Sequence, residues 1–421
     1  MRQHEVNETT KSLVAYFTKR DVALYALGIG CCHNGNADDV EENNGHDERE
    51  LRYVYERHAE FEVFPLYLLA LFFIAEKRRE NRSFGIRHFP PESMINHFDD
   101  GTCCGLLPKR CYRDPEDAKQ VQNLPLLHMS QSLTLYDNIS FVEMHDDEAD
   151  SELEVDPPMK INLETRITCV KPRTIGTFVT SVTTYHQSGK CIGTSKMVAL
   201  ILGLNPEKII PFDEAHMSSK MKKDDERIID GSRIKSNDQA TSPIDETKTK
   251  TIIRYQIPKN AALFYRLSGD YNPLHVRTGN VPDVTEGRET IRKRSVLHGL
   301  CTLGYALRAV MRYVHGLRNR QEQYEMKLSS LQCSFVKPVF VKDVLRIEIW
   351  TDEEKSLSDD GRPVLDVCFC VFRERHNIIS HGERQDDMAL DKHQYDLVLD
   401  KGRAQFQRKS GSNVAKVNSR L

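Results

Sequence analysis

The sequence predicts an α+β protein built from two copies of one unit, because two blocks of the chain carry the same order of elements. In each block a helical segment precedes runs in which apolar and polar residues alternate, as in antiparallel strands with one covered face. These runs are residues 161–170, 177–186 and 196–202 in the first block, and 328–335, 344–350 and 363–372 in the second. A helix beside such a sheet is an α+β layer pair.

The second block shows both signals most clearly. In residues 344–350, Leu345, Ile347 and Ile349 lie on one face. The opposite face carries Val344, Arg346, Glu348 and Trp350. A helix is predicted from about residue 297 to residue 313. Its apolar residues recur at helical spacing and form one stripe: Leu300, Leu303, Leu307, Val310, Met311 and Val314.

Length and composition limit the function classes. A chain of 421 residues predicts two or three domains. The net charge of −3 supplies no global basic field for nucleic acid or an acidic membrane. The longest apolar run, residues 64–75, is far short of the roughly 20 residues that a membrane helix needs. The N-terminal residues contain acids and no apolar stretch, so we expect no signal peptide.

The cysteines argue against a structural metal or a disulfide framework. There are eleven, an odd number, and no C-x-x-C pair occurs, so neither a zinc ribbon nor a thioredoxin-type site is predicted. Buried or loop thiols in a reducing compartment are the simpler interpretation. We therefore predict no metal site.

Composition also divides the chain into segments. We predict a first unit over residues 1–205, with a solvated acidic insertion at about 33–50. A charged linker is predicted over 206–250 and the second unit over 251–380. The remaining residues, 381–421, are predicted to be a polar tail.

The most informative string is LFYRLSGDYNPLH, residues 263–275. Residues 261–267 can form a helix that Ser268 and Gly269 break, and Asn272 is then a predicted N-cap with proline at the first helical position. Asp270 and His275 would face one space across a tight turn and hold a water between them. The alternative is purely structural, because an aspartate before a turn often only caps and a lone histidine is usually a satisfied core or surface group.

The string resembles the signature of the hydratase 2 family, the (R)-specific enoyl-CoA hydratases that also form part of peroxisomal multifunctional enzyme type 2 and are MaoC-like. The resemblance continues in SVLHGLCTLGYALRAV (295–310) and FVKPVFVKDVLRIEIW (335–350), and more weakly in RDVALYALGIG, RYVYERHAEFEVFP and LPLLHMSQSLTLYD of the first half. It covers most of residues 12–380. It implies a double hot-dog fold, in which two antiparallel sheets each wrap a long central helix, in agreement with the duplicated α+β unit.

The resemblance implies roles for individual residues. Asp270 and His275 match the catalytic pair, Asn272 matches its polar companion, and Gly299 matches the glycine whose N–H helps bind the thioester oxygen. The implied reaction is the reversible hydration of trans-2-enoyl-CoA to (3R)-3-hydroxyacyl-CoA in β-oxidation, without a cofactor, since coenzyme A is part of the substrate. A helix N-terminus suits the glycine's role, because its N–H groups are unpaired and carry partial positive charge.

The sequence departs from the family pattern in several places. The segment after His275 is longer by about six residues and carries Arg292, Lys293 and Arg294, which are either a basic lip for CoA phosphates or a solvated charge run. Glu56 matches an acidic residue implicated in animal members and is a possible active-site residue.

The first half has no S-G-D-x-N-P-x-H string and should be chemically silent. His128–Met129 stands where a second His-Gly would be expected. Residues 64–75 are either the wall of an acyl tunnel or plain core. The pair Gly28-x-Gly30 lacks the third glycine of a dinucleotide fingerprint, so no dehydrogenase half is expected.

Two rival functions remain open at this point: a non-catalytic acyl-CoA-binding protein and a hot-dog thioesterase. The C-terminal Ser419, Arg420 and Leu421 are a close variant of the peroxisomal address Ser-Lys-Leu. The expected partners are therefore an acyl-CoA substrate, the peroxisomal import receptor and, from the family alone, a second copy in a homodimer.

Overall fold

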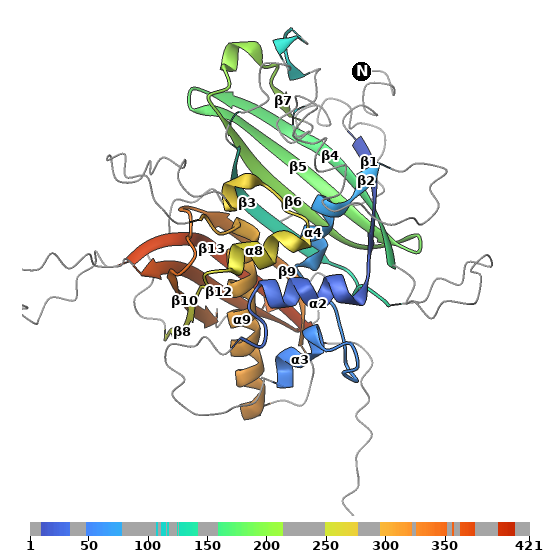
Figure 1. Ribbon diagram of the computed structural model, residues 1–421, viewed down its shortest axis with the longest axis vertical. Coiled ribbons are helices and arrows are strands. Elements are labelled where there is room, and N and C mark those ends of the chain that lie inside the picture. The colour runs from blue at the N-terminus through green and yellow to red at the C-terminus, as the bar shows by residue number, and fades with distance from the viewer. Residues whose placement is uncertain are drawn as a thin grey trace, which may run out of the picture.

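The molecule is one large antiparallel sheet with helices packed against it (Figure 1). The computed structural model describes residues 10–33, 48–77, 107, 111–114, 116–117, 124, 126–141, 159–213, 249–276, 295–321, 326–351, 356–357, 363–374 and 395–408. Within these ranges, no helix has the length and apolar character needed to cross a membrane.

The strands fall into two halves. The first half contains β1 (Thr10–Phe17), β2 (Glu76–Lys77), β3 (Leu126–Leu135), β4 (Met159–Arg173), β5 (Gly176–Gln187), β6 (Lys190–Leu202) and β7 (Phe212–Asp213). The second contains β8 (Thr251–Gln256), β9 (Met326–Phe335), β10 (Val344–Thr351), β11 (Ser356–Leu357), β12 (Pro363–Glu374) and β13 (Tyr395–Arg408). All six runs predicted from alternation are strands.

The halves are joined edge to edge. The order across the sheet is β2-β1-β4-β5-β6-β3-β9-β13-β12-β10-β8, and β7 and β11 pair with β4 and β12. At the junction β3 pairs with β9 so that Ser132 lies opposite Gln332. Each half therefore supplies the antiparallel sheet predicted for it, and the two sheets form one continuous sheet through the pairing of β3 with β9.

The long helix of the second half is α9 (Gly299–Gln321), which packs against β8, β10 and β12. Its predicted apolar stripe is confirmed: the five aliphatic residues of the stripe are buried and Met311 is partly buried. In the described part of the first half the central helix is shorter. There α4 (Tyr67–Ile74) is buried along most of its length and ends where Ala75 turns extended and leads into β2.

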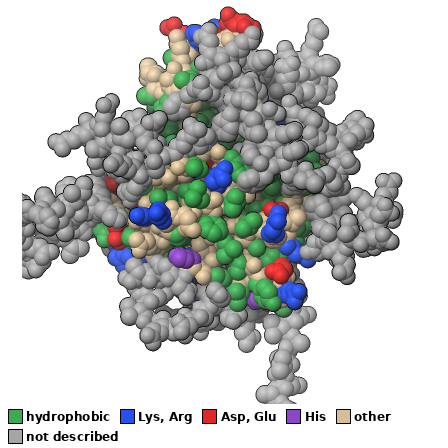
Figure 2. All heavy atoms as spheres, viewed as in Figure 1, with side chains coloured by type: hydrophobic (Ala, Val, Ile, Leu, Met, Phe, Trp, Pro, Cys, Tyr) green, Lys and Arg blue, Asp and Glu red, His purple; other side chains and the backbone are tan. Residues whose placement is uncertain are grey.

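The remaining helices are α2 (Lys19–Gly28), α3 (Glu48–Val54), η3 (Pro206–Lys208), α8 (Ala261–Tyr265), η4 (Arg266–Ser268) and η5 (Pro273–His275). The main core is shared by both halves, and Tyr25 of α2 packs on Tyr265 of α8 with ring centroids 5.7 Å apart. Figure 2 shows hydrophobic side chains gathered near the middle of the same face, where α2 and α8 lie in Figure 1. Leu27, Leu263 and Phe264 are exposed apolar residues of these two helices.

Three predicted boundaries need correction. The prediction of a polar tail over 381–421 was wrong for residues 395–408. These residues form β13, which lies between β9 and β12. Its small and apolar residues Gly402, Ala404 and Phe406 are buried, and the intervening polar residues, which suggested a tail, face outward. The prediction of a linker over 206–250 was wrong at its start, because residues 206–208 form η3 and residues 212–213 form β7.

The predicted end of the acidic insertion, at residue 50, was also wrong. Residues 48–50 begin α3, and Glu50 is buried because it forms an ion pair with Arg308 of α9. The rest of the insertion from residue 34 to residue 47, like the linker after residue 213, lies outside the described residues.

Candidate active site

The loop that follows α8 and η4 carries most of the predicted site. It turns at Gly269, whose φ of 118° favours glycine. A Cβ here would lie 2.5 Å from the Ile74 side chain of α4, so this close packing also requires glycine. The loop then enters η5, where the Leu274 N–H donates to Asn272 Oδ1 at 3.0 Å. This bond confirms the predicted N-cap.

Asp270 and His275 come together at the inner end of this loop. The Asn272 N–H donates to Asp270 Oδ1 at 3.3 Å. His275 is buried, and its Nδ1 lies 2.9 Å from the Val296 carbonyl oxygen, so Nδ1 carries the proton and donates it there. The Nε2 lone pair of His275 is then left for another ligand.

The functional atoms of Asp270, His275 and a further residue, His298, lie within 4.8 Å of one another. One water hydrogen-bonded at about 2.8 Å to each of two acceptors spans such a separation. Burial raises the pKa of Asp270 above its ordinary value, and His275 and the Asn272 N–H offset part of the rise. Asp270 is therefore a stronger base than an exposed aspartate.

The sequence interpretation did not single out His298. Its ring stacks on His275 with centroids 3.6 Å apart and planes at 25°. Its Nε2–H donates to the Asp270 carbonyl oxygen at 3.1 Å, and burial, reinforced by His275, lowers its pKa to about 2. His298 is therefore neutral and buttresses both members of the pair. The sequence does contain a signal for His298: it directly precedes Gly299, the glycine at the predicted helix start.

The same three residues are a combination that can hold a transition metal. A metal lies in the ring plane of each imidazole that binds it, at about 2.0–2.1 Å from the nitrogen. Because the rings of His275 and His298 are stacked face to face, their lone pairs do not converge on such a point. The geometry favours a water between carboxylate and imidazole over a metal ion.

Gly299 is the first residue of α9, so the N–H groups of the first helical turn lie at this site. The first bond of the helix joins the Thr302 N–H to the His298 carbonyl oxygen at 3.1 Å. A Cβ at Gly299 would lie 3.2 Å from the Phe335 ring, so the position is also tightly packed. Its place beside His298 puts the predicted oxyanion donor next to the pair of Asp270 and His275.

The other predicted residues lie elsewhere. Glu56 is exposed in the turn after α3 and is not part of the cluster of Asp270, His275 and His298. Arg292, Lys293 and Arg294 lie outside the described residues, as do Ser419, Arg420 and Leu421. We expected His128–Met129 to occupy the position of a second His-Gly pair, which would lie at a helix start. This was wrong, because His128 lies within β3.

Family models match the chain in two places. The first is described as "MFE-2 hydratase 2 N-terminal domain" and matches residues 16–95. The second is described as "MaoC like domain" and matches residues 236–363, which include the candidate site. The chain thus matches a MaoC-like domain in its second half and the N-terminal domain of an MFE-2 hydratase 2 in its first half.

Named proteins are similar to the chain to different extents. "Enoyl-CoA hydratase 2, peroxisomal" of Arabidopsis thaliana is 24% identical over 351 residues, which cover 83% of this chain and 85% of that protein. "Peroxisomal multifunctional enzyme type 2" of Mus musculus is 30% identical over 124 residues, 29% of this chain. The matched part is only 15% of the mouse protein.

Solved structures support the fold assignment. A MaoC-like dehydratase from Phytophthora capsici has a TM-score of 0.52 at 18% identity and covers 98% of this chain and 100% of that one. Full-length peroxisomal multifunctional enzyme type 2 from Drosophila melanogaster has a TM-score of 0.50 at 16% identity, covering 95% of this chain and 48% of that one. The predicted double hot-dog fold is confirmed.

Proposed function

We propose that this protein catalyses the reversible hydration of trans-2-enoyl-CoA to (3R)-3-hydroxyacyl-CoA in β-oxidation. The observation that carries the proposal is the pair formed by the partly buried Asp270 and the buried His275, which lie at one-water distance beside the N-terminus of α9. The matches to the MaoC-like domain and to the MFE-2 hydratase 2 N-terminal domain support the same reaction. The names of its relatives supply the substrate class.

The hydration step follows from the positions of the acceptors. A water donates one hydrogen to Asp270 and the other to the Nε2 atom of His275, and the N–H of Gly299 polarises the thioester carbonyl. Polarisation makes Cβ electrophilic, and Asp270, with its raised pKa, takes the proton as the water adds. The same pair then returns a proton to Cα. Because both groups lie on one side of the substrate, the addition is syn.

The supporting roles are part of the same proposal. Asn272 holds the Asp270 carboxylate through its backbone N–H, and His298 holds the ring of His275. Removing a comparable oxyanion donor costs other enzymes about 3–4 kcal/mol, which is the contribution we assign to Gly299. Arg292, Lys293 and Arg294 are proposed to bind the phosphates of CoA. The chemistry needs no cofactor, since coenzyme A belongs to the substrate.

We also propose a peroxisomal location, through the import receptor and the C-terminal tripeptide Ser419-Arg420-Leu421. The Arabidopsis and mouse relatives are named peroxisomal, in line with this proposal. A homodimer is proposed for the assembly, and light scattering on the purified protein tests it directly.

One assay separates hydration from its rivals. Loss of enoyl absorbance is followed with crotonyl-CoA and decenoyl-CoA, and thiol release is followed in parallel. A hydratase consumes the enoyl group without releasing thiol, whereas a thioesterase releases thiol. A non-catalytic acyl-CoA-binding protein would do neither, and that result would overturn the proposal.

A further inference from the structure

The hydrogen bond that orients His275 ends on a short backbone segment just before α9. His275 Nδ1 donates to the Val296 carbonyl oxygen at 2.9 Å, which leaves the Nε2 lone pair as the acceptor for water. In a neutral histidine, the partner of one ring nitrogen decides which nitrogen carries the hydrogen. The position of the Val296 carbonyl therefore decides whether Nε2 can act in the proposed reaction.

This segment is held by the β9–β10 loop, residues 336–343. Val296 pairs with Phe340 of the loop in an isolated antiparallel bridge. Two further backbone hydrogen bonds, of 2.8 and 3.1 Å, join residues 297 and 295 to the loop on either side of the bridge. A shift of the loop would therefore move the Val296 carbonyl with it.

The same loop also holds the chain that leads to Asp270. The Lys342 N–H donates to the Ile257 carbonyl oxygen, and the Ile257 N–H donates to the Asp343 carbonyl oxygen, each at 2.9 Å. Ile257 directly follows β8 and precedes α8, after which the catalytic loop begins. Lys342 adopts a φ of 71°, which a residue other than glycine keeps only where its surroundings fix it. The β9–β10 loop therefore binds both stretches of backbone that carry the site.

Arg373 of β12 is buried against this loop. Its Nη1 donates to the Pro338 carbonyl oxygen at 3.2 Å and lies 3.9 Å from Asp343 Oδ2. The same carboxylate oxygen accepts the Phe340 N–H at 2.9 Å. The guanidinium also lies over the Phe340 ring, 5.2 Å from its centroid. Arg373 thus contacts the residue that pairs with Val296 and its neighbours in the loop.

Asp396 of β13 fixes the orientation of this guanidinium. Its Oδ2 accepts from Nε of Arg373 at 3.1 Å and from Nη2 at 2.8 Å, and its Oδ1 accepts from Lys337 at 2.7 Å. Two cations, Arg373 and Lys337, balance the two carboxylates of Asp343 and Asp396. A buried ion pair adds little net stability compared with apolar packing, but a well-bonded buried network is rigid. The network therefore contributes rigidity to the loop.

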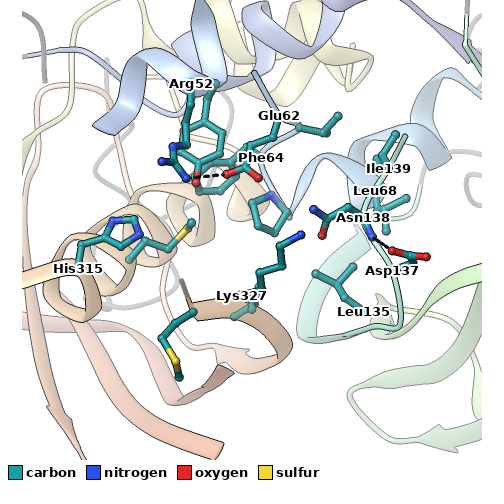
Figure 3. Close-up of a pocket in the computed structure, with 16 residues that line it drawn as sticks. Arg52, Glu62, Phe64, Leu68, Leu135, Asp137, Asn138, Ile139, His315 and Lys327 are labelled. Atoms are coloured by element: carbon teal, nitrogen blue, oxygen red, sulfur yellow. Dashed lines mark hydrogen bonds and ion pairs between the residues drawn. The ribbon is translucent and has the colours of Figure 1, made fainter. Parts of the chain in front are cut away.

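Paired charges by themselves do not indicate such a role. Figure 3 shows a cavity of about 50 Å³ whose wall carries Arg52 and Glu62, 3.4 Å apart. Asp137 of the same wall binds Lys190. These pairs belong to the first half of the chain, whereas Arg373 binds the loop that holds the catalytic residues.

One other ion pair joins the same two strands and provides a matched comparison. Arg403 of β13 donates to the buried Asp366 of β12 at 3.1 and 2.9 Å, from the same two nitrogens that Arg373 uses toward Asp396. Arg403 lies seven residues along β13 from Asp396, roughly 20 Å away. The two pairs therefore differ mainly in their distance from the loop.

We propose that Arg373 is a positioning residue for the active site. Together with Asp343 and Asp396 it fixes the β9–β10 loop, and through the loop the Val296 carbonyl that keeps the hydrogen of His275 on Nδ1. The effect on catalysis rests on the proposed hydration, whereas the effect on His275 does not.

The test compares two variants of the network with two matched controls. Arg373→Lys keeps the charge but leaves one nitrogen for partners that three nitrogens now hold, and Arg403→Lys is its control. Asp396→Asn replaces one acceptor oxygen by a donor, and Asp366→Asn is its control. Thermal melts establish that each variant is folded, and the isosteric Asp396→Asn decides the outcome if Arg373→Lys does not fold.

The first measurement is ¹⁵N NMR of the full-length protein with labelled histidine at about pH 8, above the ordinary histidine pKa. Loss of a signal in His275→Gln identifies the signals of His275. The wild type should show Nε2 without a hydrogen. In Arg373→Lys and Asp396→Asn this signal should move toward that of a protonated nitrogen, and in both controls it should not move.

The second measurement is the rate with crotonyl-CoA. The two network variants should lose about tenfold to a hundredfold in kcat, the scale of a misplacement of about 1 Å, with little change in KM. Both controls should keep wild-type values, because their ion pair is remote from the loop.

The outcomes separate this proposal from the proposed function. An unchanged His275 signal in a folded network variant would overturn the proposal, as would an equal shift in the controls. A shifted signal with wild-type kcat would overturn the link to catalysis. A wild type without hydratase activity would refute the proposed function alone, and the nitrogen signal would still decide whether Arg373 positions His275.

Discussion

The imidazole of His298 lies face to face with that of His275, with ring centroids 3.6 Å apart. The same residue donates from Nε2 to the carbonyl oxygen of Asp270 and directly precedes the glycine that begins α9. One neutral side chain thus contacts both members of the proposed catalytic pair, and its backbone directly precedes the helix whose N-terminus is proposed to bind the thioester oxygen.

Asp270→Asn and His275→Gln should each lower kcat by several orders of magnitude with little change in KM. Both groups act on the water and not on CoA, and general acid–base groups typically supply about 10²–10⁴-fold. The double variant should lose little more than either single variant, because the two groups share one water. Initial rates with crotonyl-CoA measure this. A single variant that kept more than about a tenth of wild-type turnover would contradict the assignment.

His298→Phe and His298→Gln should each lower kcat by about tenfold to a hundredfold. Phenylalanine keeps a ring against His275 but loses the bond to Asp270, and glutamine keeps a donor but loses the ring. A misplacement of about 1 Å at a catalytic group costs about a hundredfold, which sets the scale. The pH profile is the control, because a neutral positioning residue should change the rate without removing an ionisation. Wild-type kcat in both variants would show that the stack has no catalytic role.

Asp270→Asn should also be more stable than the wild type at pH 7–8. Burial raises the pKa of Asp270, so its charged form is disfavoured in the folded protein, and the amide removes this cost. The gain should shrink as the pH falls through the raised pKa toward the unfolded value near 3.9. Thermal melts between pH 4 and 8 measure the difference.

The matched control for that experiment is Asp137→Asn. The hydrogen bond and charge of Lys190 lower the pKa of Asp137, so this carboxylate stabilises the folded protein once ionised. Its amide variant should therefore be slightly less stable at pH 7, with the loss vanishing at low pH. The same direction of change in both variants would refute the proposed role of burial at Asp270.

The product should be the (3R) alcohol. Coupling the reaction to an (R)-specific 3-hydroxyacyl-CoA dehydrogenase should generate NADH, and coupling it to an (S)-specific enzyme should generate none. The direct control is (3R)-3-hydroxybutyryl-CoA added to both coupling enzymes. NADH formed only with the (S)-specific enzyme would rule out the proposed stereochemistry.

A reporter protein that carries residues 409–421 should enter peroxisomes. Arg420 keeps the positive charge of the lysine in Ser-Lys-Leu, and Leu421 supplies the apolar terminal side chain. The control reporter lacks Leu421 and should stay in the cytosol. Cytosolic fluorescence from the complete segment would show that the tripeptide is not read as an address.

The sequence was most informative where side chains alternate or recur with one period. The six strands and the apolar stripe of α9 could be predicted because each has one buried face. β13 was missed because its inward residues include Gly402 and Ala404, which contribute little hydrophobic signal. Glycine is needed at residue 402 because a Cβ there would lie 2.5 Å from the Phe369 ring. Long-range packing of this kind leaves no local pattern.

The candidate site also contains residues that the sequence could predict and residues that it could not. Asp270, Asn272 and His275 stand in one short string, so local turn chemistry was enough to place them together. The contribution of His298 depends on stacking across more than twenty residues of chain. The ion pair of Glu50 with Arg308 joins residues 258 positions apart in the chain. Glu50 lies in a segment whose composition predicts a solvated loop, so the sequence gave no sign of this contact.

The pairing of β3 with β9 makes the two halves poor candidates for separate expression. Either half alone would end its sheet in a strand of ten residues with a row of free N–H and C=O groups. Such an edge readily pairs with another chain. In the intact protein each of these strands covers the other, so the duplication itself protects the molecule against aggregation.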